Sequence, residues 1–210
     1  MSVSKIGICN IALAHLGAGA IRSFDENNKR ARMSEVFFAS VRDYLLSKFD
    51  WPFARKFKWL QPLNLPEAEQ VPNFFAYQLP NDCRTPRDIH PPGSKDPWEV
   101  MGNRLFCKID PSSGEVAGLY YTVQEVDTTK YSDTFITLLA LLLAIRIAPS
   151  ITQDKELTKT LFAQYDREYR DAWESDANIG NLYREFDEDP NNDTFVSPDG
   201  YIATSIFGTD

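Results

Sequence analysis

The chain is poor in the residues that most often build metal centres. It contains two histidines, His15 and His90, and three cysteines, Cys9, Cys83 and Cys107, none of them in a Cys-x-x-Cys spacing. A zinc site needs three or four converging ligands, and three cysteines cannot all pair within one chain. The sequence therefore predicts no metal, no cofactor and a reducing compartment.

The chain also lacks the motifs of nucleophilic catalysis. No nucleophile lies in a Gly-x-Ser-x-Gly type of turn, and His15 falls inside a helical pattern between Ala14 and Leu16, where a packed histidine is the simpler interpretation. We expect no catalytic residue and no enzymatic activity. Loop carboxylates could still be assembled into a glycosidase-like pair, and the candidates are Asp25, Glu26, Glu67, Glu69 and Glu115.

Signals for a membrane or for secretion are missing too. The N-terminal MSVSKIGICN lacks the charged region, the long apolar run and the small-residue cleavage site of a signal peptide. The most apolar run, residues 135–148, is interrupted by Thr137 and Arg146 and is shorter than the ~20 residues needed to cross a bilayer. We therefore expect no membrane span.

Positive charge is scarce overall, since the net charge is −8. This balance argues against a protein whose main task is to wrap nucleic acid, because phosphates need Lys and Arg. Residues 1–60 carry 10 basic against 5 acidic side chains, residues 61–150 carry 7 against 11, and residues 151–210 carry 5 against 14. Such polarity favours stacked contacts between copies if the fold keeps the ends apart. Ordinary solvated faces are the alternative.

Two helices are predicted in the first 50 residues. Residues 4–16 form a short amphipathic pattern, and Gly17 follows where a C-terminal cap favours glycine. A second helix is capped by Asn27 or Asn28 and stops around Phe49, because Pro52 disfavours helical geometry at the residue before it. Its apolar row is Met33, Phe37, Val41 and Leu45, flanked by Val36 and Tyr44.

Two more helices follow a region rich in turns. One is capped by Ser132 or Asp133 and is expected to end at Ala148, before Pro149; its middle, LLALLLAI, is apolar on nearly every side, as in the central helix of a bundle. The last runs from residue 154 to about 176. Its apolar stripe consists of Leu157, Leu161, Phe162, Tyr165, Tyr169, Ala172 and Trp173.

Residues 60–130 carry most of the prolines and little helical period. The stretches FFAYQLPNDC, WEVMGNRLFC and EVAGLYYTVQEV are typical of strands separated by turns, with the best hairpin at Gly102-Asn103.

The predicted fold class is α+β, mainly α. Residues 1–60 and 131–180 form a four-helix-type bundle, residues 61–130 a small antiparallel β insertion, and residues 181–210 an extended C-terminal arm.

The arm is acidic yet keeps large apolar residues, which favours a segment that becomes ordered on a partner's surface over the alternative of a frayed terminus. These residues are Tyr183, Phe186, Phe195, Tyr201, Ile202, Ile206 and Phe207.

The stretch WPFARKFKW, residues 51–59, allows two interpretations. Arg55, Lys56 and Lys58 interleaved with Phe57 and Trp59 are typical of a platform for single-stranded nucleic acid. The same alternation is typical of an edge strand with one buried face and solvated lysines.

Four stretches, SKIGICNIALAHLGAGAI, DYLLSKFDWPFARK, YQLPNDC and YSDTFITLLALLLAIRIAPSITQD, carry a family resemblance. In this order they resemble the head-to-tail adaptor proteins of tailed bacteriophages, called tail tubular protein A in some phages and head-completion or packaged-DNA-stabilising proteins in others. The resemblance covers residues 4–177. Its most specific pieces are Asn10-x-Ala12-Leu13-x-x-Leu16-Gly17, Trp51-x-Phe53-Ala54, Leu79-Pro80-x-Asp82-Cys83 and the helix over residues 135–148.

The resemblance implies a virion protein that forms a ring of usually twelve copies beneath the portal. Such a ring retains the packaged genome, lets double-stranded DNA pass without sequence specificity, and attaches the downstream nozzle or tube protein of the tail. The subunit is expected in the host cytoplasm before assembly. Arg55, Lys56 and Lys58 then become candidate contacts to DNA or a neighbour, and the candidate contacts to the portal or a neighbouring subunit are Tyr183, Phe186, Phe195, Tyr201, Ile202 and Phe207.

Two other functions stay open. Some members of this family have been proposed to degrade cell-wall glycans, so a muramidase-like activity on peptidoglycan is the alternative function. It needs two carboxylates across a cleft, one of them with a raised pKa. A cytosolic adaptor unrelated to virions is the third possibility.

Overall fold

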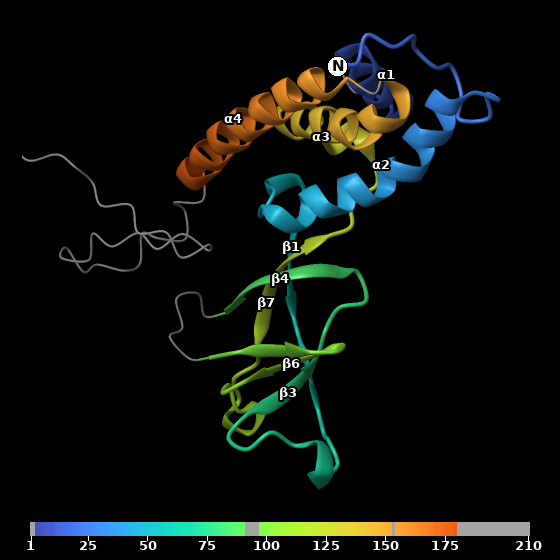
Figure 1. Ribbon diagram of the computed structural model, residues 1–210. Helices are drawn as coiled ribbons and strands as arrows, with labels where there is room; N and C mark the ends of the chain where they lie inside the picture. Colours follow the sequence, from blue (N-terminus) through green and yellow to red (C-terminus); the bar gives the residue numbers. More distant parts are fainter. Residues whose placement is uncertain (1–2, 91–96, 153, 180–210) are drawn as a thin grey trace, which may run out of the picture.

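The computed structural model describes residues 3–90, 97–152 and 154–179, which form an α+β protein (Figure 1). This part of the chain contains four α-helices and two small antiparallel sheets. The helices are α1 (Lys5–His15), α2 (Lys29–Lys48), α3 (Asp133–Ile151) and α4 (Lys155–Ile179). The arm predicted over residues 181–210 lies outside the described residues.

Capping side chains start the helices where the sequence predicts them. The side-chain oxygens of Ser4, Asn28 and Ser132 each accept a backbone N–H bond, at 3.1, 2.8 and 3.2 Å. Each bond satisfies a donor that has no partner inside the first helical turn. Asn28 and Ser132 are therefore the caps among the alternatives that the sequence left open.

Helix α3 is the centre of the helical part. Helices α1, α2 and α4 each pack against it, so the predicted central helix is confirmed. Its buried residues are Phe135, Ile136, Leu138, Leu139, Ala140, Leu141, Leu142, Leu143, Ala144, Ile147 and Ala148. A four-helix bundle is not shown by these contacts, because α3 is the shared partner of the other three helices.

Helix α3 also runs further than predicted, because it passes through Pro149 to Ile151. The proline removes one backbone donor, but it lies in the last turn, where a 2.9 Å bond from the Thr152 N–H to the Ala148 carbonyl still closes the helix. By length and composition alone this helix could cross a membrane, and 61% of its apolar segment is buried inside the protein. The core helix of a folded domain has this property.

The apolar stripes of α2 and α4 are confirmed in their centres and at Ala172, which is buried, and are wrong at Val36, Tyr44 and Phe162. Val41, Leu45 and Leu161 are buried. Val36 is 60% exposed and Phe162 is 59% exposed, because the packed face of each helix is narrower than the predicted stripe. Tyr44 is exposed as well.

The β part consists of two small antiparallel sheets. One sheet has the strand order β1-β7-β4, and the other has the order β2-β3-β6-β5, all antiparallel. The strands are β1 (Arg55–Trp59), β2 (Gln61–Leu63), β3 (Phe75–Gln78), β4 (Cys83–His90), β5 (Glu99–Met101), β6 (Arg104–Cys107) and β7 (Gly118–Val123). The predicted hairpin joins β5 and β6, and Gly102 has φ +62°, which glycine adopts without strain.

Strands β2 and β4 were not predicted. Pro86 lies within β4, which is an edge strand where a missing N–H is tolerated. The pairing of β4 with β7 also shifts register twice, after Cys83 and after Pro86. These irregularities hide the alternation that marks a strand in a sequence.

Figure 1 shows the helical part at one end of the molecule and the sheets extending away from it. The chain leaves α2 through β1 and returns to α3 from β7. Strand β1 begins at Arg55, so the β part starts inside the segment assigned to the helical core. These two connections join the two parts of the protein.

Candidate interaction surface

The stretch from Trp51 to Ala54 fixes the exit of α2 against the helical part. Trp51 is buried, and its indole Nε1 donates a 2.9 Å hydrogen bond to the Leu45 carbonyl in the last turn of α2. Its ring lies edge-on to Phe135 of α3, with centroids 5.0 Å apart. Pro52 then begins a short 3-10 helix that turns the chain into β1.

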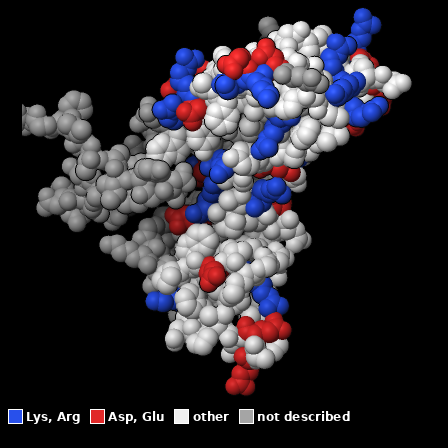
Figure 2. Space-filling view, in the orientation of Figure 1, with Lys and Arg blue, Asp and Glu red and all other residues white. Residues whose placement is uncertain are grey.

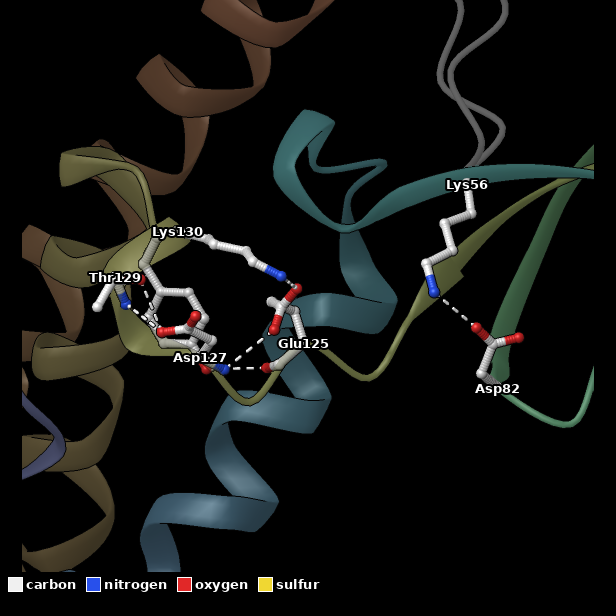
Figure 3. A network of polar contacts seen from close by, with 7 residues as sticks. Lys56, Asp82, Glu125, Asp127, Thr129 and Lys130 are labelled. Carbon is white, nitrogen blue, oxygen red and sulfur yellow. Dashed lines mark hydrogen bonds and ion pairs between the residues drawn. The ribbon is translucent and has the colours of Figure 1, made fainter.

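The three basic side chains of β1 have different surroundings. Arg55 forms a 2.9 Å ion pair with Asp50, and Lys56 forms a 2.8 Å ion pair with Asp82 (Figure 3). Lys58 is exposed and forms no ion pair with any residue that the structure describes. Lys58 can therefore meet an outside anion without first giving up a partner.

Asp82 connects β1 to β7 through side chains. It accepts a 3.0 Å hydrogen bond from the Tyr121 hydroxyl in addition to the bond from Lys56. The bond from Lys56 lowers the pKa of Asp82, and the bond from Tyr121 acts in the same direction. Burial raises the pKa of Tyr121 to about 12, and the Asp82 carboxylate adds to that rise.

A second polar network holds the return from β7 to α3 (Figure 3). Glu125 forms a 2.8 Å ion pair with Lys130, and Asp127 accepts bonds from the Thr129 N–H and hydroxyl at 3.0 and 2.7 Å. Burial raises the pKa of Glu125, but hydrogen bonds from Lys130 and the Asp127 backbone outweigh it, so the pKa is lowered. Both connections between the two parts are thus fixed by ion pairs.

Phe57 and Trp59 do not lie on a buried face, which corrects the strand interpretation. They are 39% and 54% exposed. With His90 and Tyr120 from neighbouring strands they form a group that we call the β1 aromatic patch (Phe57, Trp59, His90 and Tyr120). The Phe57 ring centroid lies 4.7 Å from that of Tyr120 and 5.0 Å from that of Trp59, and Trp59 lies 5.2 Å from His90.

The opposite face of this sheet is the buried one. Leu119, Tyr121 and Ile89 lie there and are almost inaccessible to solvent. Lys58 pairs with Leu119 and so shares this face, yet its ammonium group reaches water because β1 is an edge strand and the side chain is long. The prediction of an edge strand is confirmed, whereas the predicted buried face is wrong.

Gly118 gives the patch its shape. It is paired with Trp59 on one side and His90 on the other. A Cβ at this position would lie only 2.6 Å from the Phe57 ring. The Phe57 ring therefore packs directly over the backbone of Gly118 on the neighbouring strand, where any larger residue would collide with it.

Two polar groups lie at the patch, the Asp88 carboxyl beside it and the His90 ring nitrogen Nδ1 within it. Asp88 is paired with Tyr120; burial raises the pKa of Asp88, although a bond from the Ile89 N–H opposes the rise. His90 Nδ1 is buried without a hydrogen-bond partner in the described part of the chain. His90 and Tyr120 were not predicted as members of this surface, because no local sequence pattern brings residues 57, 90 and 120 together.

The five candidate acids for glycan hydrolysis come from three different loops, and Glu115 lies in the loop before β7. Asp25 and Glu26 lie in the loop between α1 and α2, whereas Glu67 and Glu69 lie between β2 and β3, at the other end of the molecule (Figure 1). A bond from the Arg22 N–H lowers the pKa of Glu26, which is opposite to the shift a general acid needs. Glu69 pairs with Arg104 at 2.6 Å.

The charge of the surface is uneven. On the face drawn in Figure 2, most basic side chains lie over the helical part and its junction with the sheets, and the tip of the β part carries acidic side chains. No group of three or more His, Cys, Asp or Glu side chains in the described ranges could hold a metal ion.

The arm residues predicted to contact a partner lie outside the described residues, so their role stays a prediction. They are Tyr183, Phe186, Phe195, Tyr201, Ile202 and Phe207.

In comparisons with known proteins, no family model matches the chain, and no curated protein matches it.

Proposed function

We propose that this chain is a head-to-tail adaptor of a tailed bacteriophage. In this proposal about twelve copies form a ring beneath the portal, retain the packaged DNA and offer an attachment surface to the tail. The protein acts through shape and association, and it has no reacting centre of its own.

The proposal is carried by where the residues of the resemblance lie. Asn10 donates a 2.9 Å bond to the Ile21 carbonyl and accepts a 2.8 Å bond from the Ile21 N–H, which fixes the loop after α1. Trp51 is bonded to the end of α2, and Asp82 is bonded to β1 and β7. Each specific motif thus fixes how two segments meet, so proteins with these motifs are expected to share the fold.

The shape of the molecule agrees with a subunit that meets partners at two ends. The helical part, with α3 at its centre, serves as the bundle-like body, and the sheets project away from it (Figure 1). A ring of such subunits can contact the portal with one end and the tail with the other. The acidic arm, residues 181–210, is the proposed contact to the portal or to a neighbouring subunit.

The basic residues of β1 support at most a weak DNA contact. Arg55 and Lys56 are engaged by Asp50 and Asp82, which leaves Lys58 as the residue most ready to bind a backbone phosphate. A net charge of −8 per subunit disfavours tight binding of DNA. A passage that DNA must slide through benefits from such weak contacts.

Cosedimentation with the portal protein of the same genome tests the proposal. The full-length chain is expected to sediment with the portal at physiological salt, and substitution of Phe195 and Tyr183 by alanine is expected to reduce the bound fraction at least fivefold. The matched control is substitution of Asn191 and Asn192 by alanine, in the same arm. A full-length protein that stays in the supernatant with the portal present would contradict the adaptor role.

A further inference from the structure

We propose that, in the unassembled protein, residues 201–207 of the same chain dock along β1 and cover the β1 aromatic patch. This contact is independent of the adaptor role, because it forms within a single free chain. It is argued from the open edge of β1, from the sequence of the C-terminal segment, and from its length and charge.

The receptor is an apolar surface beside an open strand edge. Phe57 and Trp59 expose much of their rings, and among the described residues β1 pairs only with β7. An extended segment can add to such an edge through its backbone groups and place alternate side chains on the neighbouring face. Four adjacent rings then offer the apolar contact that such a segment needs.

The segment YIATSIF, residues 201–207, has the composition of a strand. It is rich in β-branched and aromatic residues, contains no proline, and is bounded by Gly200 and Gly208. It is also uncharged between Asp199 and Asp210, so it can lie beside Asp88 without a repulsive charge. Its hydroxyl groups suit the unpartnered Nδ1 of His90.

The chain is long enough to reach β1 from the end of α4. Tyr169 of α4 touches Phe49 at 4.8 Å between ring centroids. Phe57 follows Phe49 by eight residues of chain, and Ile179 follows Tyr169 by ten helical residues. The lengths of these two stretches limit the distance between Phe57 and Ile179 to about 50 Å. The residues between 180 and 200 span up to about 70 Å when extended, which exceeds this separation, and a tether that spans its two sites gives an effective concentration on the order of millimolar.

Charge favours the same contact. Residues 180–210 carry seven acidic side chains and one arginine, a net charge of −6. Strand β1 carries Arg55, Lys56 and Lys58, and no described residue neutralises Lys58. The acidic residues that precede the docking segment can therefore meet Lys58, while the uncharged residues 201–207 cover the aromatic rings.

Photo-cross-linking of the full-length protein tests the contact. Phe207 is replaced by the photoreactive p-benzoylphenylalanine, and cross-linked peptides are mapped by mass spectrometry in a mixture of light and heavy isotope-labelled protein. We expect links to residues 55–60 or 118–120 within chains of one isotope. The control places the same group at Phe186 and is expected to give fewer than a tenth of these links. Links elsewhere, or links between isotopes, overturn the proposal.

Hydrogen exchange gives a second measurement that no cross-linker disturbs. The double variant Ile202→Asp and Ile206→Asp is expected to speed amide exchange in residues 55–59 at least tenfold in the full-length chain. The control variant Asn191→Asp and Asn192→Asp adds the same charge outside the docking segment and should leave these rates unchanged. Equal exchange in the wild type and the first variant overturns the contact.

Discussion

The indole Nε1 of Trp51 lies 2.9 Å from the backbone carbonyl oxygen of Leu45 and donates a hydrogen bond to it. This bond satisfies one of the carbonyls that the end of α2 leaves without a helical partner. It also sets the direction in which the chain leaves the helical part and enters β1. The position of the β part relative to α3 depends on this contact.

Substitution Trp51→Phe tests that dependence. A phenylalanine keeps most of the ring packing against Phe135 but leaves the Leu45 carbonyl without its donor, so we expect a loss of about 1 kcal/mol or more in the free energy of unfolding. Urea unfolding followed by circular dichroism measures it. Trp59→Phe, at an exposed ring, is the control and should change stability by less than ~0.5 kcal/mol. Equal effects would contradict the structural role of Trp51.

Substitution Asn10→Ala should also destabilise the protein, by about 2 kcal/mol, because it leaves the Ile21 N–H and carbonyl without partners. Thermal unfolding of the variant is the measurement. Asn27→Ala lies at an exposed position of the same loop and serves as the matched control. An Asn10 variant as stable as the control would show that the motif has another purpose.

Gly118 and Phe57 are predicted to be energetically coupled. Gly118→Ala places a methyl group 2.6 Å from the Phe57 ring, and displacing the ring should cost about 1 to 3 kcal/mol. The same change in a Phe57→Ala background should cost less, since the ring is gone. A double-mutant cycle from urea unfolding measures the coupling. Additive effects would mean that the ring does not rest on this glycine.

Acid should weaken the protein partly through Asp82. Its pKa is lowered in the folded state, so its contribution is present above the unfolded pKa of ~3.9 and disappears as the pH falls through the folded value. Asp82→Asn should flatten the decline of unfolding free energy below pH ~4, by less than about 1 kcal/mol because the pair is half exposed. The control is Glu99→Gln on β5. A steeper decline in the Asp82 variant would contradict the ion pair.

Alkali should act through buried tyrosines, Tyr165 among them, since burial raises its pKa. Burial raises the pKa of Tyr77, Tyr121 and Tyr131 to about 12 each. Their contribution to stability is therefore complete below the unfolded pKa of ~10 and is lost as the pH rises through the folded values. Tyrosinate absorbance of the folded protein should show a late phase that is absent in urea. A single phase near pH ~10 in both states would contradict the burial of these hydroxyls.

The helices were predictable because their signals are local. Asn28, Ser132 and the apolar run of α3 act over one or two turns, and the hairpin at Gly102 needs only its two central residues. The strand β4 was not predictable, because Pro86 and two register shifts obscure its alternation. Such irregular pairing depends on the neighbouring strand.

The candidate surface was predicted only in part. The sequence marks Lys56, Lys58, Phe57 and Trp59 as unusual, but the exposure of the rings follows from the burial of Leu119 on the opposite face of the sheet. The contributions of His90 and Tyr120 depend on strand order, which brings together positions about 30 residues apart. No local pattern encodes that order.

Electron cryomicroscopy of the full-length chain mixed with the portal protein of the same genome tests the central claim most directly. The adaptor proposal predicts an added ring of identical subunits beneath the portal, with the helical part and the sheets of each subunit contacting different neighbours. Portal particles that bind the chain in no annular position, or that show no added density at saturating protein, would contradict it.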